Sequence, residues 1–184
     1  SGRHLLSVIS EVIDLARMEV SAETLNLQPT HLGNLGAELA GMFSAACDRK
    51  GLRFELNADV APAEYLADRT KLRQVLINLC GNAVRVTEAG FVRLSIAQRG
   101  GEVGFEVTDT GPGIPEADLA RVFEPFWHKG DEGSGLGLAI AQRHVTMMGG
   151  TLEVSSVEGE GARFAFALTL TPHAGEQRPD ELRR

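Results

Sequence analysis

Apolar residues recur every three or four positions in four stretches of the chain and alternate with polar residues in six others. A period of 3.6 residues is typical of an amphipathic helix, and strict alternation is typical of a strand with one buried face. The pattern therefore predicts helices at 4–20, 32–50, 69–86 and from the glycine-rich stretch 133–140 up to residue 148. It predicts strands at 24–28, 52–56, 91–98, 103–108, 151–155 and 162–170.

The first helix, 4–20, carries an apolar band that is too wide for packing against one neighbour, which is typical of a helix in a bundle. Because the pattern starts without an N-terminal cap, we expect this helix to be the second half of a helical hairpin. A helix that folds back on its own domain is the alternative. The 184 residues, 43% of them hydrophobic, suit one main domain. We place it at 24–170 and expect 171–184 to be a flexible tail.

Helix 69–86 carries a row of uncharged polar residues beside its apolar stripe. Asp68 precedes the helix as a plausible N-cap, and Gln74, Asn78 and Asn82 stand four residues apart on one face. Asparagine is a mediocre helix former, so two of them inside a strong helix indicate a functional role. The alternative is an ordinary solvated polar face.

A carboxylate and a loop too rich in glycine and proline for regular structure follow the strand 103–108. The segment is Asp109-Thr110-Gly111-Pro112-Gly113-Ile114-Pro115, and we interpret it as the floor of a nucleotide site. The carboxylate of Asp109 can accept a hydrogen bond from the exocyclic amine of adenine, whereas guanine has a carbonyl at that position. Such a contact would select ATP over GTP.

Glycines at positions 133, 135 and 137 lead into the last helix. Without side chains, backbone N–H groups and the helix N-terminus can approach phosphate oxygens. The stretch differs from a Walker A loop, which closes with Gly-Lys-Ser/Thr, and from a dinucleotide fingerprint, which follows a strand. A short helix is expected from Pro115 toward Phe123, and the aperiodic segment 124–132 after it is expected to be a mobile lid. The amide oxygen of Asn82 is a hard ligand that suits Mg²⁺.

Charge and composition exclude several classes of function. A net charge of −7 argues against a nucleic-acid surface. No apolar stretch approaches the roughly 20 residues that span a bilayer, so we expect no membrane contact by this segment and a cytoplasmic location. Cys47 and Cys80 lie in apolar helical patterns without CxxC spacing, which predicts buried free thiols.

Four of these motifs resemble, in order, the N, G1, F and G2 boxes of the sensor histidine kinases of two-component systems. They are the segments 74–83, 109–115, 123–126 and 133–140. The resemblance implies the Bergerat fold, an α/β (α+β) two-layer sandwich in which a mixed, mostly antiparallel sheet packs on three helices. It covers 24–170 as the catalytic ATP-binding domain. It also identifies 1–20 as the second helix of the dimerisation and phosphoacceptor hairpin.

The resemblance implies a role for individual residues in a site for ATP and Mg²⁺. Asn82 matches the Mg²⁺ ligand, Asn78 the amide beside the phosphates and Asp109 the adenine-binding carboxylate. Arg85 stands where the family usually carries a lysine near the phosphates, and Lys129 lies in the lid, where related kinases often place a lysine against the terminal phosphate. The residues implied as catalytic are Asn78, Arg85 and Lys129. The nucleotide-binding set is Asn78, Asn82, Arg85, Asp109, Gly111, Gly113, Ile114, Phe126, Gly133, Ser134, Gly135, Leu136, Gly137 and Leu138.

Two positions depart from the family pattern. Val86 stands where phenylalanine or tyrosine is usual, and Ala162 stands where a threonine often precedes the final strand. Both departures thin the usual contacts of the adenine pocket and could lower affinity, although small apolar changes in a pocket wall typically cost little.

Position 78 separates kinases from the related hydrolases. DNA gyrase, the heat-shock chaperone ATPases and the mismatch-repair ATPases share the fold and carry a glutamate there to activate water. Asn78 cannot take a proton, which favours the kinase. His4, His31, His144 and His173 lack the sequence context of a phosphoacceptor. This segment should therefore bind ATP without autophosphorylating alone.

We therefore expect a protein-histidine kinase that donates the terminal phosphate of Mg-ATP to a histidine on an upstream helix. The acceptor helix would belong to the same or the partner protomer of a homodimer, and the phosphate would pass on to an aspartate of a response-regulator receiver domain. The alternative is a catalytically silent module that senses a nucleotide, for example a cyclic dinucleotide.

Overall fold

The computed structural model describes residues 24–127 and 134–173. The predicted helix 4–20, the part of the predicted lid that contains Lys129, Gly133 and most of the predicted tail lie outside these residues.

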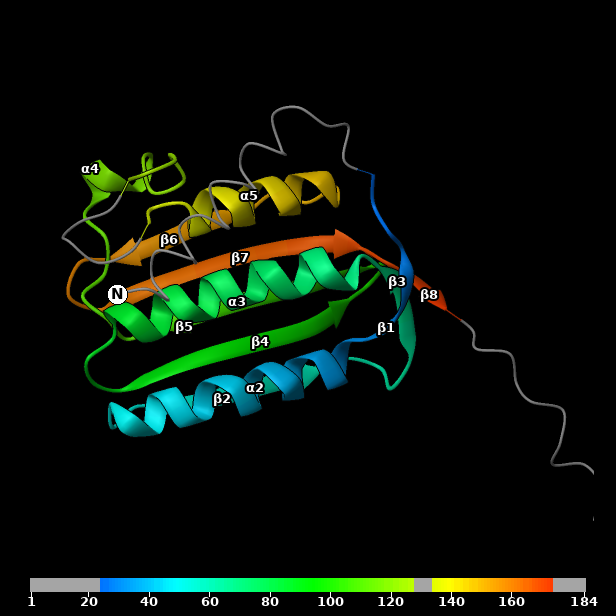
Figure 1. Ribbon diagram of the computed structural model, residues 1–184, viewed down its shortest axis with the longest axis horizontal. Coiled ribbons are helices and arrows are strands. Elements are labelled where there is room, and N and C mark those ends of the chain that lie inside the picture. The colour runs from blue at the N-terminus through cyan, green and yellow to red at the C-terminus, as the bar shows by residue number, and fades with distance from the viewer. Residues whose placement is uncertain (1–23, 128–133, 174–184) are drawn as a thin grey trace, which may run out of the picture.

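A five-stranded sheet forms one layer of the fold (Figure 1). Strands β2 and β4 are parallel, and all other neighbours are antiparallel. The prediction of a mixed, mostly antiparallel sheet is therefore confirmed. In spatial order the strands are β2 (Arg53–Asp59), β4 (Phe91–Arg99), β5 (Glu102–Asp109), β7 (Gly161–Thr169) and β6 (Glu153–Val157).

Three helices cover one face of this sheet (Figure 1). They are α2 (Leu32–Arg49), α3 (Arg69–Val86) and α5 (Gly137–Met147), and a single turn, α4 (Glu116–Leu119), precedes α5. The two-layer α+β sandwich predicted from the motifs is confirmed. None of the helices in the described ranges is long and apolar enough to cross a membrane.

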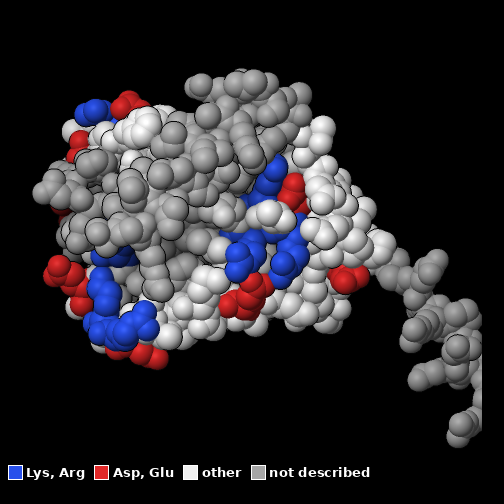
Figure 2. Space-filling model, viewed as in Figure 1, with Lys and Arg blue, Asp and Glu red and all other residues white. Residues whose placement is uncertain are grey.

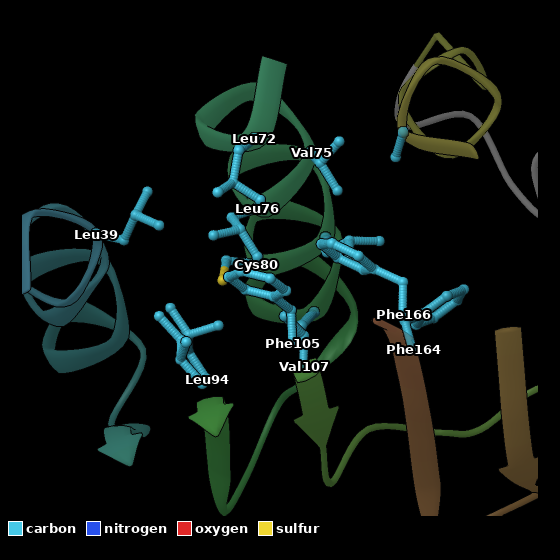
Figure 3. Packing of buried hydrophobic residues seen from close by; sticks show 14 of the residues in the cluster. Leu39, Leu72, Val75, Leu76, Cys80, Leu94, Phe105, Val107, Phe164 and Phe166 are labelled. Atoms are coloured by element: carbon cyan, nitrogen blue, oxygen red, sulfur yellow. The ribbon is translucent and has the colours of Figure 1, made fainter. Parts of the chain in front are cut away.

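The core lies between the helices and the sheet. Figure 3 shows Leu39, Leu72 and Leu76 from the helices above Leu94 and Phe105 from the sheet. The rings of Phe105 and Phe166 stack with centroids 4.9 Å apart. The alternating residues of the strands and the stripes of the helices thus meet in one apolar layer, as the periodicity requires.

The two cysteines are part of this core. Cys47 and Cys80 are both free and buried, which confirms the prediction of buried thiols. Burial raises the pKa of Cys80 to about 12, because a thiolate would lose its hydration there. At neutral pH the thiol therefore packs as a small apolar group.

A second, three-stranded sheet closes one end of the molecule (Figure 1). Its order is β1 (Gln28–His31), β3 (Glu64–Ala67) and β8 (Thr171–His173). The structure differs here from the sequence-based expectation. Residues 24–27 have no regular structure where a strand was expected, the strand β3 was not expected, and β8 begins where the tail was expected.

Pairing across the chain explains these differences. Pro29 pairs with Leu66 from an edge strand, where the missing N–H of proline is tolerated. On the other side of β3, Leu66 pairs with Thr171, more than a hundred residues away. Strands of three or four residues are therefore fixed by distant partners rather than by their own pattern.

Ion pairs fasten α3 to its neighbour. Glu38 of α2 accepts hydrogen bonds from Arg69 and Arg73 of α3, each at 2.6 Å. On the face seen in Figure 2, basic and acidic side chains lie next to one another. Asp68 caps the start of α3 by accepting a hydrogen bond from the N–H of Lys71 at 3.0 Å, which confirms the predicted cap.

Candidate functional site

A cavity of about 540 Å³ lies between α3, the loop after β5 and the start of α5. Its lining combines apolar side chains with amides, a guanidinium, a carboxylate and glycines. The lining residues are Ile77, Asn78, Gly81, Asn82, Arg85, Val86, Asp109, Pro112, Gly113, Ile114, Pro115, Val122, Trp127, Ser134, Gly135, Gly137, Leu138, Ala162 and Phe164.

The amide row of α3 forms one wall of this cavity. Gln74 donates a hydrogen bond to the side-chain oxygen of Asn78 at 2.9 Å. Asn78 donates in turn to the backbone oxygen of Gly137 at 2.9 Å. These two bonds orient the amide of Asn78 and join α3 to the start of α5, so Asn78 is more than part of a solvated face.

Asn82 and Arg85 lie one turn further along the same wall. The guanidinium of Arg85 donates a hydrogen bond to the side-chain oxygen of Asn82 at 2.6 Å. A cation thus rests on the oxygen that the sequence analysis assigned to Mg²⁺. Both side chains line the cavity, so an anionic ligand would find a guanidinium and an amide side by side.

Asp109 lies at the floor of the cavity with 3% of its surface exposed. Its side-chain oxygen accepts a hydrogen bond from the N–H of Gly111 at 2.8 Å. Burial raises the pKa of Asp109, while hydrogen bonds from the backbone of Gly111 and Ala162 oppose this shift. The carboxylate is thus a desolvated acceptor held in place by its own loop.

The raised pKa predicts how stability depends on pH. Folded Asp109 holds its proton at pH values at which the unfolded chain has lost it. This contribution to stability is complete below the ordinary pKa of aspartate and is lost as the pH rises through the raised pKa. Asp109→Asn does not titrate there. We therefore expect the free energy of unfolding of the wild type, relative to the variant, to decrease as the pH rises across this interval.

Urea unfolding of the ligand-free proteins at several pH values from about 4 to about 7 measures this difference. The comparison cancels contributions from all other carboxylates, because the two proteins share them. A difference that stays constant with pH, or that increases with rising pH, would contradict the assigned direction of the shift.

The loop after Asp109 is held by the end of β6 and by the turn between β6 and β7. Ser156 accepts a hydrogen bond from the N–H of Ile114 at 2.8 Å and donates one to the backbone oxygen of Gly161 at 2.6 Å. The N–H of Gly159 donates to the backbone oxygen of Pro112 at 2.8 Å. These bonds fix the position of the loop, which forms part of the cavity lining.

Glycines before and at the start of α5 also line the cavity. Gly135 has a φ of +70°, and a Cβ there would lie 2.6 Å from the backbone carbon of Phe126. The N–H of Phe126 donates to the backbone oxygen of Gly135 at 2.9 Å. Helix α5 begins at Gly137, and its N-cap residue, Leu136, makes no side-chain cap hydrogen bond. Its backbone N–H groups are therefore suited to meet an anion.

The structure brings most of the residues predicted from the motifs to this cavity. Those that line it are Asn78, Asn82, Arg85, Asp109, Gly113, Ile114, Ser134, Gly135, Gly137 and Leu138. Gly111 lies directly behind the carboxylate of Asp109. Val86 and Ala162, the two departures from the family pattern, also line it.

Other predicted residues lie elsewhere. The side chain of Leu136 is fully buried with Ile140 and does not line the cavity. Phe126 is 59% exposed with a φ of +63° and does not line it either. Contact of either residue with a nucleotide stays a prediction. Lys129 and Gly133 lie outside the described residues.

The apolar wall was missed by reasoning from the sequence. Trp127 belongs to a stretch without any period, Val122 lies at the end of the predicted short helix, and Phe164 was predicted only as a residue on one face of a strand. The alternation of strand 162–170 did place Phe164 on the buried face. It could not show that this part of the face is left open to a cavity.

Comparison with known proteins decides the family. The model of the histidine kinase-, DNA gyrase B-, and HSP90-like ATPases matches residues 67–172 of this chain, more than half of its length. The chain belongs to this ATPase family. The matched region includes α3, the loop after β5 and α5, the three elements that form the cavity.

Similar members of the ATPase family are sensor kinases. The chain is 33% identical over 181 residues to the autoinducer 2 sensor kinase/phosphatase LuxQ of Vibrio cholerae, covering 92% of this chain and 21% of LuxQ. It is 34% identical over 177 residues to the aerobic respiration control sensor protein ArcB of Escherichia coli, covering 91% of this chain and 22% of ArcB. The chain spans about a fifth of the length of these curated relatives.

A solved structure agrees with these relatives. The crystal structure of full-length ShkA in complex with AMPPNP is 39% identical with a TM-score of 0.88, over 95% of this chain and 37% of that one. The resemblance to sensor histidine kinases is therefore confirmed, and the described residues form a catalytic ATP-binding domain of the histidine kinase type.

Proposed function

We propose that this domain binds Mg-ATP and donates the terminal phosphate to a histidine on another helix of its kinase. The observation that carries the proposal is the mixed lining of the cavity. A buried carboxylate, Asp109, and apolar side chains line it together with the amides of Asn78 and Asn82 and the guanidinium of Arg85. The carboxylate and the apolar side chains would suit an adenine base, and the amides and the guanidinium would suit a triphosphate.

Adenine recognition would rest on Asp109. Its carboxylate can accept a hydrogen bond from the exocyclic amine, and its burial makes that bond strong because water does not compete. Ile114 and Phe164 would cover the faces of the base. Val86 and Ala162 offer smaller surfaces than the family usually has, which would lower affinity without changing the choice of base.

Phosphate binding would rest on α3 and α5. The start of α5 at Gly137 offers backbone N–H groups. Arg85 would turn from Asn82 to the phosphates, since a guanidinium prefers an anion to an amide oxygen. That movement would release the side-chain oxygen of Asn82.

The released oxygen fits a magnesium ion. Mg²⁺ takes oxygen ligands and usually shares them with substrate phosphates and water. The described residues contain no group of three or more His, Cys, Asp or Glu side chains that could hold a metal alone. Asn82 would therefore hold Mg²⁺ together with the nucleotide, and the ion would neutralise charge on the transferred phosphate.

Transfer rather than hydrolysis suits the site. Asn78 is held between Gln74 and Gly137 and carries no proton acceptor comparable to a glutamate. Phosphate would pass to a histidine on a helix outside the described residues and then to an aspartate of a receiver domain. The kinase would be a homodimer, and the reaction would take place in the cytoplasm. None of the comparisons favours a silent nucleotide-sensing module.

Calorimetry with this chain tests the proposal. Mg-ATP should release heat with one site per chain, and Mg²⁺ without nucleotide should give no specific heat, because the nucleotide supplies most of the ligands. Trp127, the single tryptophan, lines the cavity, so its fluorescence should change with the same midpoint.

Addition of radiolabelled ATP to a chain extended upstream through its acceptor histidine should label the protein. Absence of binding by ATP, or binding of a cyclic dinucleotide in its place, would overturn the assignment.

A further inference from the structure

Helix α3 ends differently from its two neighbours. Gly51 follows α2 with a φ of +70°, and Gly149 follows α5 with a φ of +86°. Such glycines are the usual way to satisfy the last carbonyls of a helix. Helix α3 instead runs into Thr87, which is extended with a φ of −83° and a ψ of 128°. The carbonyls of its last turn need another partner.

Lys50 supplies that partner from the end of α2. Its ammonium donates to the backbone oxygens of Val84 at 2.8 Å, Arg85 at 3.1 Å and Thr87 at 2.8 Å. All three donors of the ammonium are used. A positive charge at a helix C-terminus also interacts favourably with the helix dipole. The two helices end on the same side of the molecule (Figure 1), which brings Lys50 to this position.

The segment that Lys50 holds forms part of the cavity wall. Arg85 and Val86 line the cavity. Thr87 is fully buried and donates a hydrogen bond to the backbone oxygen of Ala83 at 2.7 Å. A Cβ on Gly111 would lie 3.3 Å from both Thr87 and Val86. The end of α3 therefore lies against the loop that holds Asp109, and it also carries Arg85, the residue that we assign to the phosphates.

We propose that Lys50 is a positioning residue for the nucleotide site. It does not line the cavity. By fixing the end of α3, it sets the position of Arg85 for the phosphates and the spacing between Val86 and the loop of Asp109. The inference rests on the proposed binding of Mg-ATP.

Loss of the ammonium should loosen this turn. In Lys50→Met the side chain keeps its length, but the carbonyls of Val84 and Thr87 lose a charged donor. We expect Mg-ATP affinity to fall about fivefold to tenfold, the size of effect that one ordinary hydrogen bond typically has. Lys50→Arg, which keeps the charge and several donors, should recover most of the affinity.

Fluorescence of Trp127 during ATP titration, at a temperature well below the melting points of all variants, provides the measurement. Leu32→Val is the matched control. Leu32 is fully buried at the opposite end of α2, so the variant loses stability without touching the end of α3. It should bind ATP like the wild type.

The inference is overturned if Lys50→Met melts earlier but binds ATP like the wild type, or if Leu32→Val weakens binding equally. If Lys50→Met does not fold, Lys50→Gln replaces it under the same criteria. Failure of the wild type to bind ATP would refute the proposed function instead, so the two failures are distinguishable.

Discussion

Replacement of Asp109 by asparagine is expected to lower the preference of this domain for ATP over inosine triphosphate by about a hundredfold. Inosine carries a carbonyl oxygen where adenine carries its exocyclic amine. The wild-type carboxylate accepts from the amine and repels the carbonyl. In Asp109→Asn, the N–H of Gly111 would hold the amide oxygen, as it holds the carboxylate now. The amide nitrogen would then face the base.

The comparison of two nucleotides separates recognition from folding. A variant that has only lost stability binds both nucleotides less well. If residue 109 contacts the base, the change from an acceptor to a donor should weaken the binding of ATP and leave the binding of inosine triphosphate unchanged or improve it. Calorimetric titration of both proteins with both nucleotides gives the four affinities. If the ratio of the two affinities is the same in wild type and variant, Asp109 does not read the base.

The elements in which the periodic pattern continues over many residues could be predicted from the sequence. The stripe of α3 and the alternation of β4 and β5 extend over enough residues to define both element and buried face. Their ends were also predictable where a local cap exists, as Asp68 shows. Local chemistry and tertiary packing agree in these elements, which makes the pattern informative.

The strands of the small sheet could not be predicted in the same way. Strand β3 has four residues and lies between two other strands, and the hydroxyl of its buried Tyr65 donates to Gln98 at 2.8 Å. The sequence of residues 64–67 does not predict these partners. The expected strand at 24–28 has the alternation of a strand, but most of its length does not pair with another strand.

The candidate site shows the same division. Motif spacing placed Asn78, Asn82 and Asp109 together, because helix periodicity and a strand end determine their directions. It could not show that Leu136 points into the core while its glycine neighbours line the cavity. Nor could it find Lys50, whose acceptors lie 34 to 37 residues further along the chain.

Replacement of Gly113 by alanine is expected to damage both the fold and the nucleotide site. Gly113 has a φ of +69°, and a Cβ there would lie 2.2 Å from the backbone oxygen of Val157. Backbone cannot swing aside as a side chain can, so the loop or the turn between β6 and β7 must move. We expect the free energy of unfolding to fall by about 2 kcal/mol or more. ATP affinity should fall at least about tenfold, because Ile114 and Asp109 share the displaced loop.

Gly100→Ala is the control that separates the effect of the clash with Val157 from the effect of the left-handed backbone conformation. Gly100 has a φ of +61° but nothing within 4 Å of its Cβ position, and it lies in the hairpin turn at the other end of β5 from Asp109. The control should therefore lose about 1 kcal/mol of stability from the left-handed conformation alone and keep wild-type ATP affinity. Urea unfolding and ATP titration of both variants measure the difference. Equal losses of stability in the two variants, with ATP affinity unchanged in both, would mean that the contact between the loop and Val157 does not hold the adenine end of the site in place.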